Sequence, residues 1–174
     1  MKKIKEHLKR NFAIYAVLLT CIVVVCIALF LTREEKKETV DTSMFQVLTL
    51  KETLKLFETD EPKLLVISVS ECTATIGYVP YLQIAQAKYG YTTYYLELDD
   101  LDYYSKDFQT LLSKLDMEYR FQNKVDKFSA FIGSTPMTVI IKNKKMVHGY
   151  IGSMDTDTLY TITKLYGVTN EKKN

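Results

Sequence analysis

An uninterrupted apolar stretch near the N-terminus constrains this chain more than any other feature of its sequence. No charged residue lies between Arg10 and Arg33, and residues 12–31 are almost wholly apolar. A bilayer core about 30 Å thick needs about 20 such residues in helical form, and a helix satisfies its backbone hydrogen bonds within the segment. The pattern predicts one transmembrane helix over residues 12–32, in contact with the lipid membrane.

The charged residues on either side of the stretch indicate its orientation. Residues 1–11 carry five Lys or Arg side chains and one Glu, whereas the basic residues after the stretch are interleaved with acidic ones. Positive residues favour the cytoplasmic side of a membrane. We therefore expect a single-pass protein of the cell membrane, with a cytoplasmic basic N-terminus over residues 1–11 and an extracytoplasmic C-terminal domain.

A cleaved signal peptide is the main alternative to a retained helix. The apolar region of a signal peptide usually runs about 7–15 residues and ends at a small-x-small cleavage site. Here the apolar run is longer, and it ends Phe30-Leu31-Thr32-Arg33 without such a site. The segment 18–21 resembles a lipoprotein processing site, but apolar residues continue after Cys21. A retained transmembrane helix is the better interpretation.

Charge and composition exclude several kinds of partner. The formal net charge of +2 comes from residues 1–10, which contribute +4, so the rest of the chain is slightly acidic at −2. Nucleic-acid binding needs a basic patch on the folded domain, and we expect no nucleic-acid partner. His7 and His148 lie on opposite sides of the predicted membrane, so we expect no metal site, and no motif indicates a cofactor.

Apolar spacing after residue 46 alternates between strand and helix. Helices are expected at residues 49–57, 75–89, 103–121 and 155–166, and strands at residues 64–69, 92–98, 137–142 and 146–151. Strands separated by helices imply parallel pairing, whereas the last two strands must form an antiparallel hairpin. The order β-α-β-α-β-β-α, with an extra helix in front, predicts an α/β fold with a central mixed sheet flanked by helices.

The same reading divides the chain and assigns its inward helix faces. Residues 33–46 are expected as a juxtamembrane linker, residues 47–168 as the domain and residues 169–174 as a flexible tail. The inward positions expected in two of the helices are Ile76, Val79, Leu82, Ile84 and Ala87 in the second, and Leu159, Ile162 and Leu165 in the last.

A single cysteine of the predicted domain, Cys72, lies between a buried strand and a helix. Unpaired N–H groups and the positive end of the helix dipole favour the thiolate at such a position. Pro80 follows eight residues later inside the predicted helix, and Thr135-Pro136 directly precedes a strand. Taken alone, a cysteine in this position is more often structural than reactive. With no second cysteine, the domain holds no intramolecular disulfide.

Taken together, these residues resemble the thioredoxin superfamily over about residues 47–167. In that family a strand leads into Cys-x-x-Cys at a helix start, a proline lies eight residues after the first cysteine, and a cis-proline precedes the hairpin. Cys72, Pro80 and Thr135-Pro136 keep this spacing, and Gly152 resembles the glycine that ends the last strand. The resemblance implies a thioredoxin-like fold preceded by one transmembrane helix, with Pro136 cis.

The sequence departs from the family at two positions. Thr75 occupies the place of the second cysteine, so the motif is a degenerate Cys-x-x-Thr, and Glu71 replaces the usual aromatic residue. A neighbouring carboxylate disfavours the thiolate. The resemblance implies that Cys72 is the nucleophile, that Thr75 donates a hydrogen bond to its thiolate, and that Thr135-Pro136 pairs with an extended polypeptide by β-augmentation.

Two functional hypotheses follow. One is a monothiol thiol-disulfide oxidoreductase that exchanges or captures disulfides of secreted polypeptides through Cys72. The other is a redox-inactive accessory or binding module. The layout of a membrane anchor and a thioredoxin-like outer domain is similar to the bacteriocin transport accessory proteins of Gram-positive bacteria. That similarity implies a secreted, cysteine-containing peptide and a membrane export system as partners.

Overall fold

The computed structural model describes residues 12–31 and 38–169 and divides the chain into two compact units, Met1–Lys37 and Glu38–Asn174. The expected cytoplasmic segment 1–11, the linker residues up to 37 and the tail from residue 170 lie outside the described residues. The first unit contains the 20-residue helix α2 (Phe12–Leu31).

Helix α2 is continuous, as expected from the apolar stretch. Within the described residues, none of the helices combines the length and the apolar character required of a membrane span. The transmembrane assignment and the localisation stay predictions from the sequence.

The second unit is built on a five-stranded mixed sheet with the strand order β1-β3-β2-β6-β7. β1, β2 and β3 are parallel, whereas β6 runs antiparallel to both β2 and β7. The central strand β2 is buried at every position from Leu64 to Ser68, as its nearly continuous apolar run predicts. The strands are β1 (Gln46–Val47), β2 (Lys63–Ser68), β3 (Thr93–Glu97), β6 (Met137–Lys142) and β7 (Lys145–Ile151).

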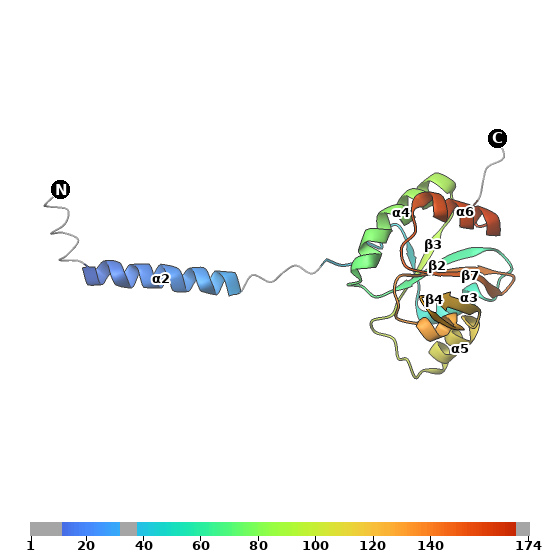
Figure 1. Cartoon of the computed structure of the whole chain (residues 1–174), viewed down its shortest axis with the longest axis horizontal. Helices are drawn as coiled ribbons and strands as arrows, with labels where there is room; N and C mark the ends of the chain where they lie inside the picture. The colour runs from blue at the N-terminus through green and yellow to red at the C-terminus, as the bar shows by residue number, and fades with distance from the viewer. Residues whose placement is uncertain (1–11, 32–37, 170–174) are drawn as a thin grey trace. The chain divides into compact units, whose positions relative to one another are not determined.

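Helices cover both faces of this sheet (Figure 1). α4 (Thr73–Tyr89) and α6 (Thr156–Tyr166) lie together on one face, and α3 (Leu50–Leu56) and α5 (Lys106–Lys114) lie on the other with the 3₁₀ helix η1 (Phe128–Phe131). Each face buries its own apolar cluster. The sheet and its two helical layers therefore form one three-layer domain.

The arrangement confirms the expected fold. The elements follow the order β2-α4-β3-α5-β6-β7-α6, preceded by β1 and α3. The peptide bond between Thr135 and Pro136 is cis and directly precedes β6. α3 begins with a capping box, in which Thr49 and Glu52 satisfy each other's backbone N–H groups. The domain has the thioredoxin-like α/β fold that the resemblance implied.

One expected helix is wrong over half of its length. The helix predicted at residues 103–121 is helical only in α5 (Lys106–Lys114), which is capped by Ser105 and Leu115. A two-stranded hairpin of β4 (Glu118–Phe121) and β5 (Lys124–Lys127) replaces the rest. Tyr119 and Phe121 alternate with exposed Glu118 and Arg120, which is the period of a half-buried strand. The apolar residues of α5 precede this strand directly, so the change from a helical to a strand period was not recognised in the sequence.

Two helix faces also differ from the expected ones. Ile84 is 55% exposed and Leu165 is 73% exposed, and Ala87 is exposed too. The buried positions of α4 are Thr75, Tyr78, Val79, Leu82 and Ala85. Val79 and Leu82 in α4 and Leu159 in α6 are buried as expected. The buried face of α4 also includes Thr75 and Tyr78, which a purely hydrophobic pattern does not select, so the expected face was only partly correct.

The domain begins earlier than expected. Its compact unit starts at Glu38, and the N–H of Val40 donates to the carbonyl of Ser70 at 2.8 Å. Phe45 is buried and β1 follows it directly. Residues 38–46, expected as part of the linker, therefore pack with the domain. Two-residue strands such as β1 carry no periodicity that a sequence pattern can reveal.

Candidate functional site

Cys72 lies where the central strand gives way to a helix. β2 ends at Ser68, and Cys72 is the N-cap residue of α4. Its N–H donates to the carbonyl of Val69 at 3.3 Å, and its own carbonyl accepts from the N–H of Ile76 at 2.9 Å. The intervening loop is held by the N–H of Ser70, which donates to Asp99 Oδ2 at 2.8 Å. Both ends of the loop are therefore fixed, and the half-buried thiol has a defined position.

The thiol contacts the segment that carries the cis-proline. Cys72 Sγ lies 3.5 Å from the carbonyl oxygen of Thr135, to which the S–H donates. The two residues are 63 positions apart in the sequence. This contact brings together the cysteine and the Thr135-Pro136 pair that sequence analysis singled out.

The surroundings of Cys72 favour its thiolate. Partial burial raises the pKa of the Cys72 thiol, but hydrogen bonding to the side chains of Thr135 and Thr75 and to the N–H groups of Thr75 and Ala74 outweighs it, so that the pKa lies below its ordinary value. The neutral thiol makes no capping hydrogen bond with the helix. The N–H groups become its partners once the sulfur is an acceptor, because they are unpaired donors of the first turn.

Thr75, expected to donate to the thiolate, is fully buried beneath Cys72. Its Oγ1 lies 2.5 Å from Ser68 Oγ. Ser68 is also fully buried and was missed by sequence reasoning. The available signal was the presence of one hydroxyl in an otherwise apolar buried strand, since a buried polar group requires a partner.

The backbone around the cis-proline is already engaged. The N–H of Thr135 donates to the carbonyl of Gly133 at 3.0 Å, and its carbonyl accepts from Cys72. Pro136 is buried, and its carbonyl accepts from the N–H of Gly152 at 2.8 Å. An extended polypeptide that pairs with Thr135 therefore has to displace these bonds or use the remaining lone pair of the carbonyl. The substrate-binding roles of Thr135 and Pro136 stay predictions.

An acidic hollow of about 550 Å³ adjoins the Cys72 loop. Its lining consists of Val69, Ser70, Glu71, Glu97, Asp99 and Asp100. Burial and the neighbouring carboxylates Asp99 and Asp100 raise the pKa of Glu97. Within residues 12–31 and 38–169, no three His, Cys, Asp or Glu side chains are grouped to hold a metal ion. Four of the six residues that line the hollow are acidic.

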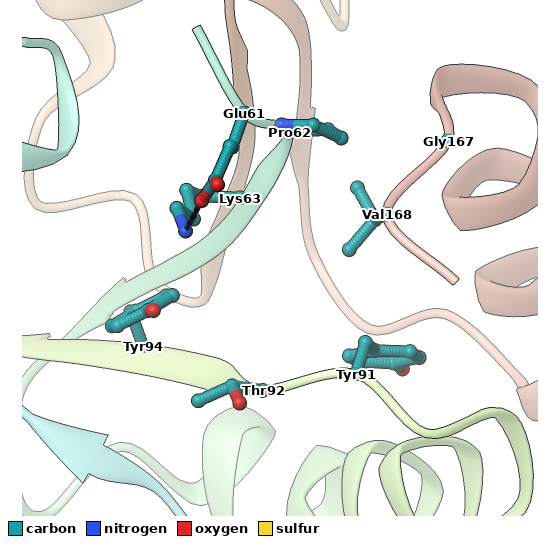
Figure 2. A pocket seen from close by; sticks show the side chains of 8 residues that line it. All are labelled: Glu61, Pro62, Lys63, Tyr91, Thr92, Tyr94, Gly167 and Val168. Carbon is teal, nitrogen blue, oxygen red and sulfur yellow. Dashed lines mark hydrogen bonds and ion pairs between the residues drawn. The ribbon is translucent and has the colours of Figure 1, made fainter. Parts of the chain in front are cut away.

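A second cavity, of about 350 Å³, lies away from the thiol (Figure 2). It is lined by Glu61, Pro62, Lys63, Tyr91, Thr92, Tyr94, Gly167 and Val168. Lys63 Nζ pairs with Glu61 at 2.7 Å and lies 6.0 Å from the centre of the Tyr94 ring. Most of these residues lie at the start of the parallel strands β2 and β3, and Gly167 and Val168 follow α6, whereas Cys72 follows the end of β2. The cavity and Cys72 therefore lie at opposite ends of the strands.

No protein-family model and no curated protein sequence matches the chain. Among solved structures, it is similar to thioredoxin from Plasmodium falciparum, with 14% identity over 70% of this chain and 98% of that one and a TM-score of 0.48. It is also similar to mitochondrial thioredoxin 3 from Saccharomyces cerevisiae, with 14% sequence identity over 70% of this chain and 96% of that one and a TM-score of 0.48. Thioredoxin O2 from Arabidopsis thaliana has 17% sequence identity over 73% of this chain and 98% of its own, with a TM-score of 0.46.

Proposed function

We propose that this chain is a membrane-anchored, extracytoplasmic thioredoxin-like protein that exchanges or captures disulfides of secreted polypeptides through Cys72. The observation that carries the proposal is the contact between Cys72 Sγ and the Thr135 carbonyl, at the start of α4. In this contact a half-buried thiol with a lowered pKa lies beside Thr135-Pro136, the segment that we propose to pair with an extended polypeptide. A thiolate in this setting is a nucleophile.

The chemistry has two balanced steps. The Cys72 thiolate attacks one sulfur of a substrate disulfide, forming a Cys72–substrate disulfide and expelling the other sulfur as a thiolate that takes up a proton. A second thiolate then attacks this mixed disulfide and releases Cys72. If that thiolate belongs to the substrate, the reaction is an isomerisation. If it belongs to a small thiol or another protein, a second such thiol completes a two-electron reduction of the substrate.

The absence of a second cysteine in the domain determines which groups complete the reaction. Position 75, where the resemblance expects the resolving thiol, holds a threonine whose hydroxyl contacts Ser68. A hydroxyl cannot attack a disulfide under these conditions, so the domain alone does not resolve its adduct. Resolution depends on a thiol from outside the domain, and the mixed disulfide with Cys72 is therefore the species that accumulates when such thiols are scarce.

The membrane anchor in this proposal rests on residues 12–31. They are almost wholly apolar, form one helix and follow a basic segment. An anchored domain meets polypeptides as they leave the membrane, and an export system for secreted, cysteine-containing peptides is the partner that suits it. Protease added to intact spheroplasts should remove the C-terminal domain. Protection of the domain in intact spheroplasts would contradict this orientation.

The test of the thiol chemistry is the pH dependence of Cys72 alkylation in the full chain. Cys21→Ala and Cys26→Ala leave Cys72 as the only thiol. We expect the thiolate to titrate below the free-cysteine value of about 8.5, and a peptide disulfide to form a mixed disulfide that a Cys72→Ser variant does not form. A thiol that titrates at or above about 8.5 and captures no peptide disulfide would refute the exchange chemistry.

A redox-inactive binding module is the second candidate. It is favoured by the threonine at position 75, which stands where the resemblance expects a resolving cysteine. If this candidate is correct, a Cys72→Ser variant retains full activity in peptide export in cells. Loss of that activity in the same variant, with unchanged expression, would support the exchange chemistry instead.

A further inference from the structure

Two buried hydroxyl groups connect the central strand to the reactive end of α4. Ser68 Oγ lies 3.3 Å from the Val69 carbonyl and 2.5 Å from Thr75 Oγ1. Both side chains are fully buried. Cys72 is the N-cap residue of α4 and Thr75 is the third residue of the same helix, so both lie in its first turn. The Thr75 hydroxyl also lowers the pKa of the Cys72 thiol. The buried hydroxyl chain Ser68–Thr75 therefore reaches the helix turn that carries the sulfur.

The direction of the hydrogen bonds in this chain depends on the charge of the sulfur. While the thiol is neutral, its S–H donates to the Thr135 carbonyl. Ser68 can then donate to the Val69 carbonyl and accept from Thr75. A thiolate requires donors instead, so the Thr75 hydroxyl turns toward Sγ. Its oxygen then needs a donor of its own, and the Ser68 hydroxyl lies within hydrogen-bond distance to become one.

We propose that Ser68 is a positioning residue for the Cys72 thiolate, acting through Thr75. When Ser68 donates to Thr75, it polarises the Thr75 hydroxyl and holds it toward the sulfur, because successive hydrogen bonds in a buried chain strengthen one another. The inference rests on the proposed function, since it concerns the same nucleophile. It adds a residue on β2 that touches neither the sulfur nor a substrate.

Few titratable groups act on this chain of hydroxyls. Tyr95 on β3 is fully buried, and burial raises the pKa of Tyr95 to about 12, with smaller effects from Ser68, Glu97, Asp99 and Cys72. The Tyr95 hydroxyl makes no hydrogen bond within the described part of the chain, although Ser68 is near enough to influence it.

The remaining charged neighbours are carboxylates. Glu71 lies in the loop before Cys72, and it lines the acidic hollow with Glu97, Asp99 and Asp100. The segment that packs on the sulfur from the other side contributes the neutral Thr135 and Pro136. None of these groups is altered in the variants below, so a change in the pKa of Cys72 reports on the hydroxyl chain.

The test compares the pH dependence of Cys72 alkylation by iodoacetamide in variants of the full chain, each carrying Cys21→Ala and Cys26→Ala. We expect Thr75→Val to raise the pKa of Cys72 by about one unit, a tenfold loss of rate below the pKa. Ser68→Ala should raise it by about half a unit, a threefold loss. The double variant should match Thr75→Val, because Ser68 acts only through Thr75. Thr93→Val is the matched control.

Thr93 is suited to this control because its hydroxyl is fully buried and has no hydrogen-bond partner among the described residues. It is the first residue of β3, whereas Ser68 pairs with Glu97 at the last. Its removal should leave the pKa of Cys72 unchanged. Ser68→Thr and Thr75→Ser keep the hydroxyl groups and should keep the unsubstituted pKa. Near-UV circular dichroism establishes that each variant is folded.

Three results would overturn the inference: an unchanged pKa in Ser68→Ala, a shift in Thr93→Val as large as that in Ser68→Ala, or a larger shift in the double variant than in Thr75→Val. Failure of the proposed function has a different signature. A Cys72 pKa at or above about 8.5 in the unsubstituted chain would contradict the exchange chemistry, while the differences among the variants would still support or refute the role of Ser68.

Discussion

Two glycines of the domain should respond in opposite directions to the same substitution. Gly149 lies on β7 opposite Val139, where an added Cβ would come within 2.6 Å of Phe128 Cε2 and 2.8 Å of its Cδ2. Phe128 is fully buried. Gly77 lies inside α4, and an added Cβ there would meet no atom within 4 Å. Gly149→Ala and Gly77→Ala therefore add one methyl group to a closed site and to an open one.

The magnitudes follow from these surroundings. The ring of Phe128 cannot move aside cheaply, and overpacking a closed core costs about 1–3 kcal/mol of unfolding free energy. Gly77→Ala removes the entropy penalty of a glycine inside a helix and should add about 0.5–1 kcal/mol. For a domain of this size, 1 kcal/mol corresponds to about 4 °C in Tm. We expect the two variants to differ by at least about 6 °C.

The assay is thermal and urea unfolding of the full chain. Because the chain has 13 tyrosines and no tryptophan, near-UV circular dichroism of the tyrosines is the direct reading of tertiary packing. Gly149→Ala should lower the urea midpoint and Gly77→Ala should raise it, both with an unchanged slope. A Gly149→Ala variant as stable as the unsubstituted protein would refute the close approach of β7 to Phe128.

Two further predictions concern the same core. Burial raises the pKa of Tyr78, Tyr91 and Tyr95 above the ordinary value of about 10. The unfolded chain therefore releases these protons first, and the free energy of unfolding should fall as the pH rises above about 10, by about 1.4 kcal/mol per pH unit for each tyrosine. Urea midpoints measured between pH 8 and 11 test this, and a flat profile would contradict it. Leu82→Ala, at a fully buried position, should lower the free energy of unfolding by about 2–5 kcal/mol. Ile84→Ala, at a position that is 55% exposed, should change it by less than about 0.5 kcal/mol. Comparable losses in the two variants would mean that Ile84 is buried, as the sequence periodicity predicted.

The parts of the fold that the sequence predicts are those with a strong local signal. The β2 run is apolar throughout, β6 and β7 are separated by the tight turn at Asn143 and Lys144, and Gly90 ends α4 in the left-handed conformation. The β4–β5 hairpin was missed because its apolar residues follow a helix whose period they partly continue. Its turn depends on Gln122, which has a φ of 53° and is not a residue that marks turns.

The candidate site was predictable in its members and not in its contacts. Cys72, Thr75 and Thr135-Pro136 were identified through the family resemblance, and Cys72 meets Thr135 as that resemblance implies. The hydrogen bond between Thr75 and Ser68 has no sequence signature, because it depends on how α4 is rotated over β2. The same rotation places Ile84 and Ala87 in solvent, so both errors have one physical origin.

That rotation also gives a reason why threonine suits position 75. The side chain there points into the protein, next to Ser68, and has no exposed surface. A hydroxyl in this place finds an acceptor or donor on β2 in either charge state of Cys72, whereas an apolar side chain would leave Ser68 with the Val69 carbonyl as its one partner among the described contacts. In the proposed exchange chemistry, a domain without a resolving thiol keeps its mixed disulfide until another thiol arrives. Stabilising the departing Cys72 thiolate through Thr75 would then favour release of the captured chain, since a thiol of lower pKa is the better leaving group.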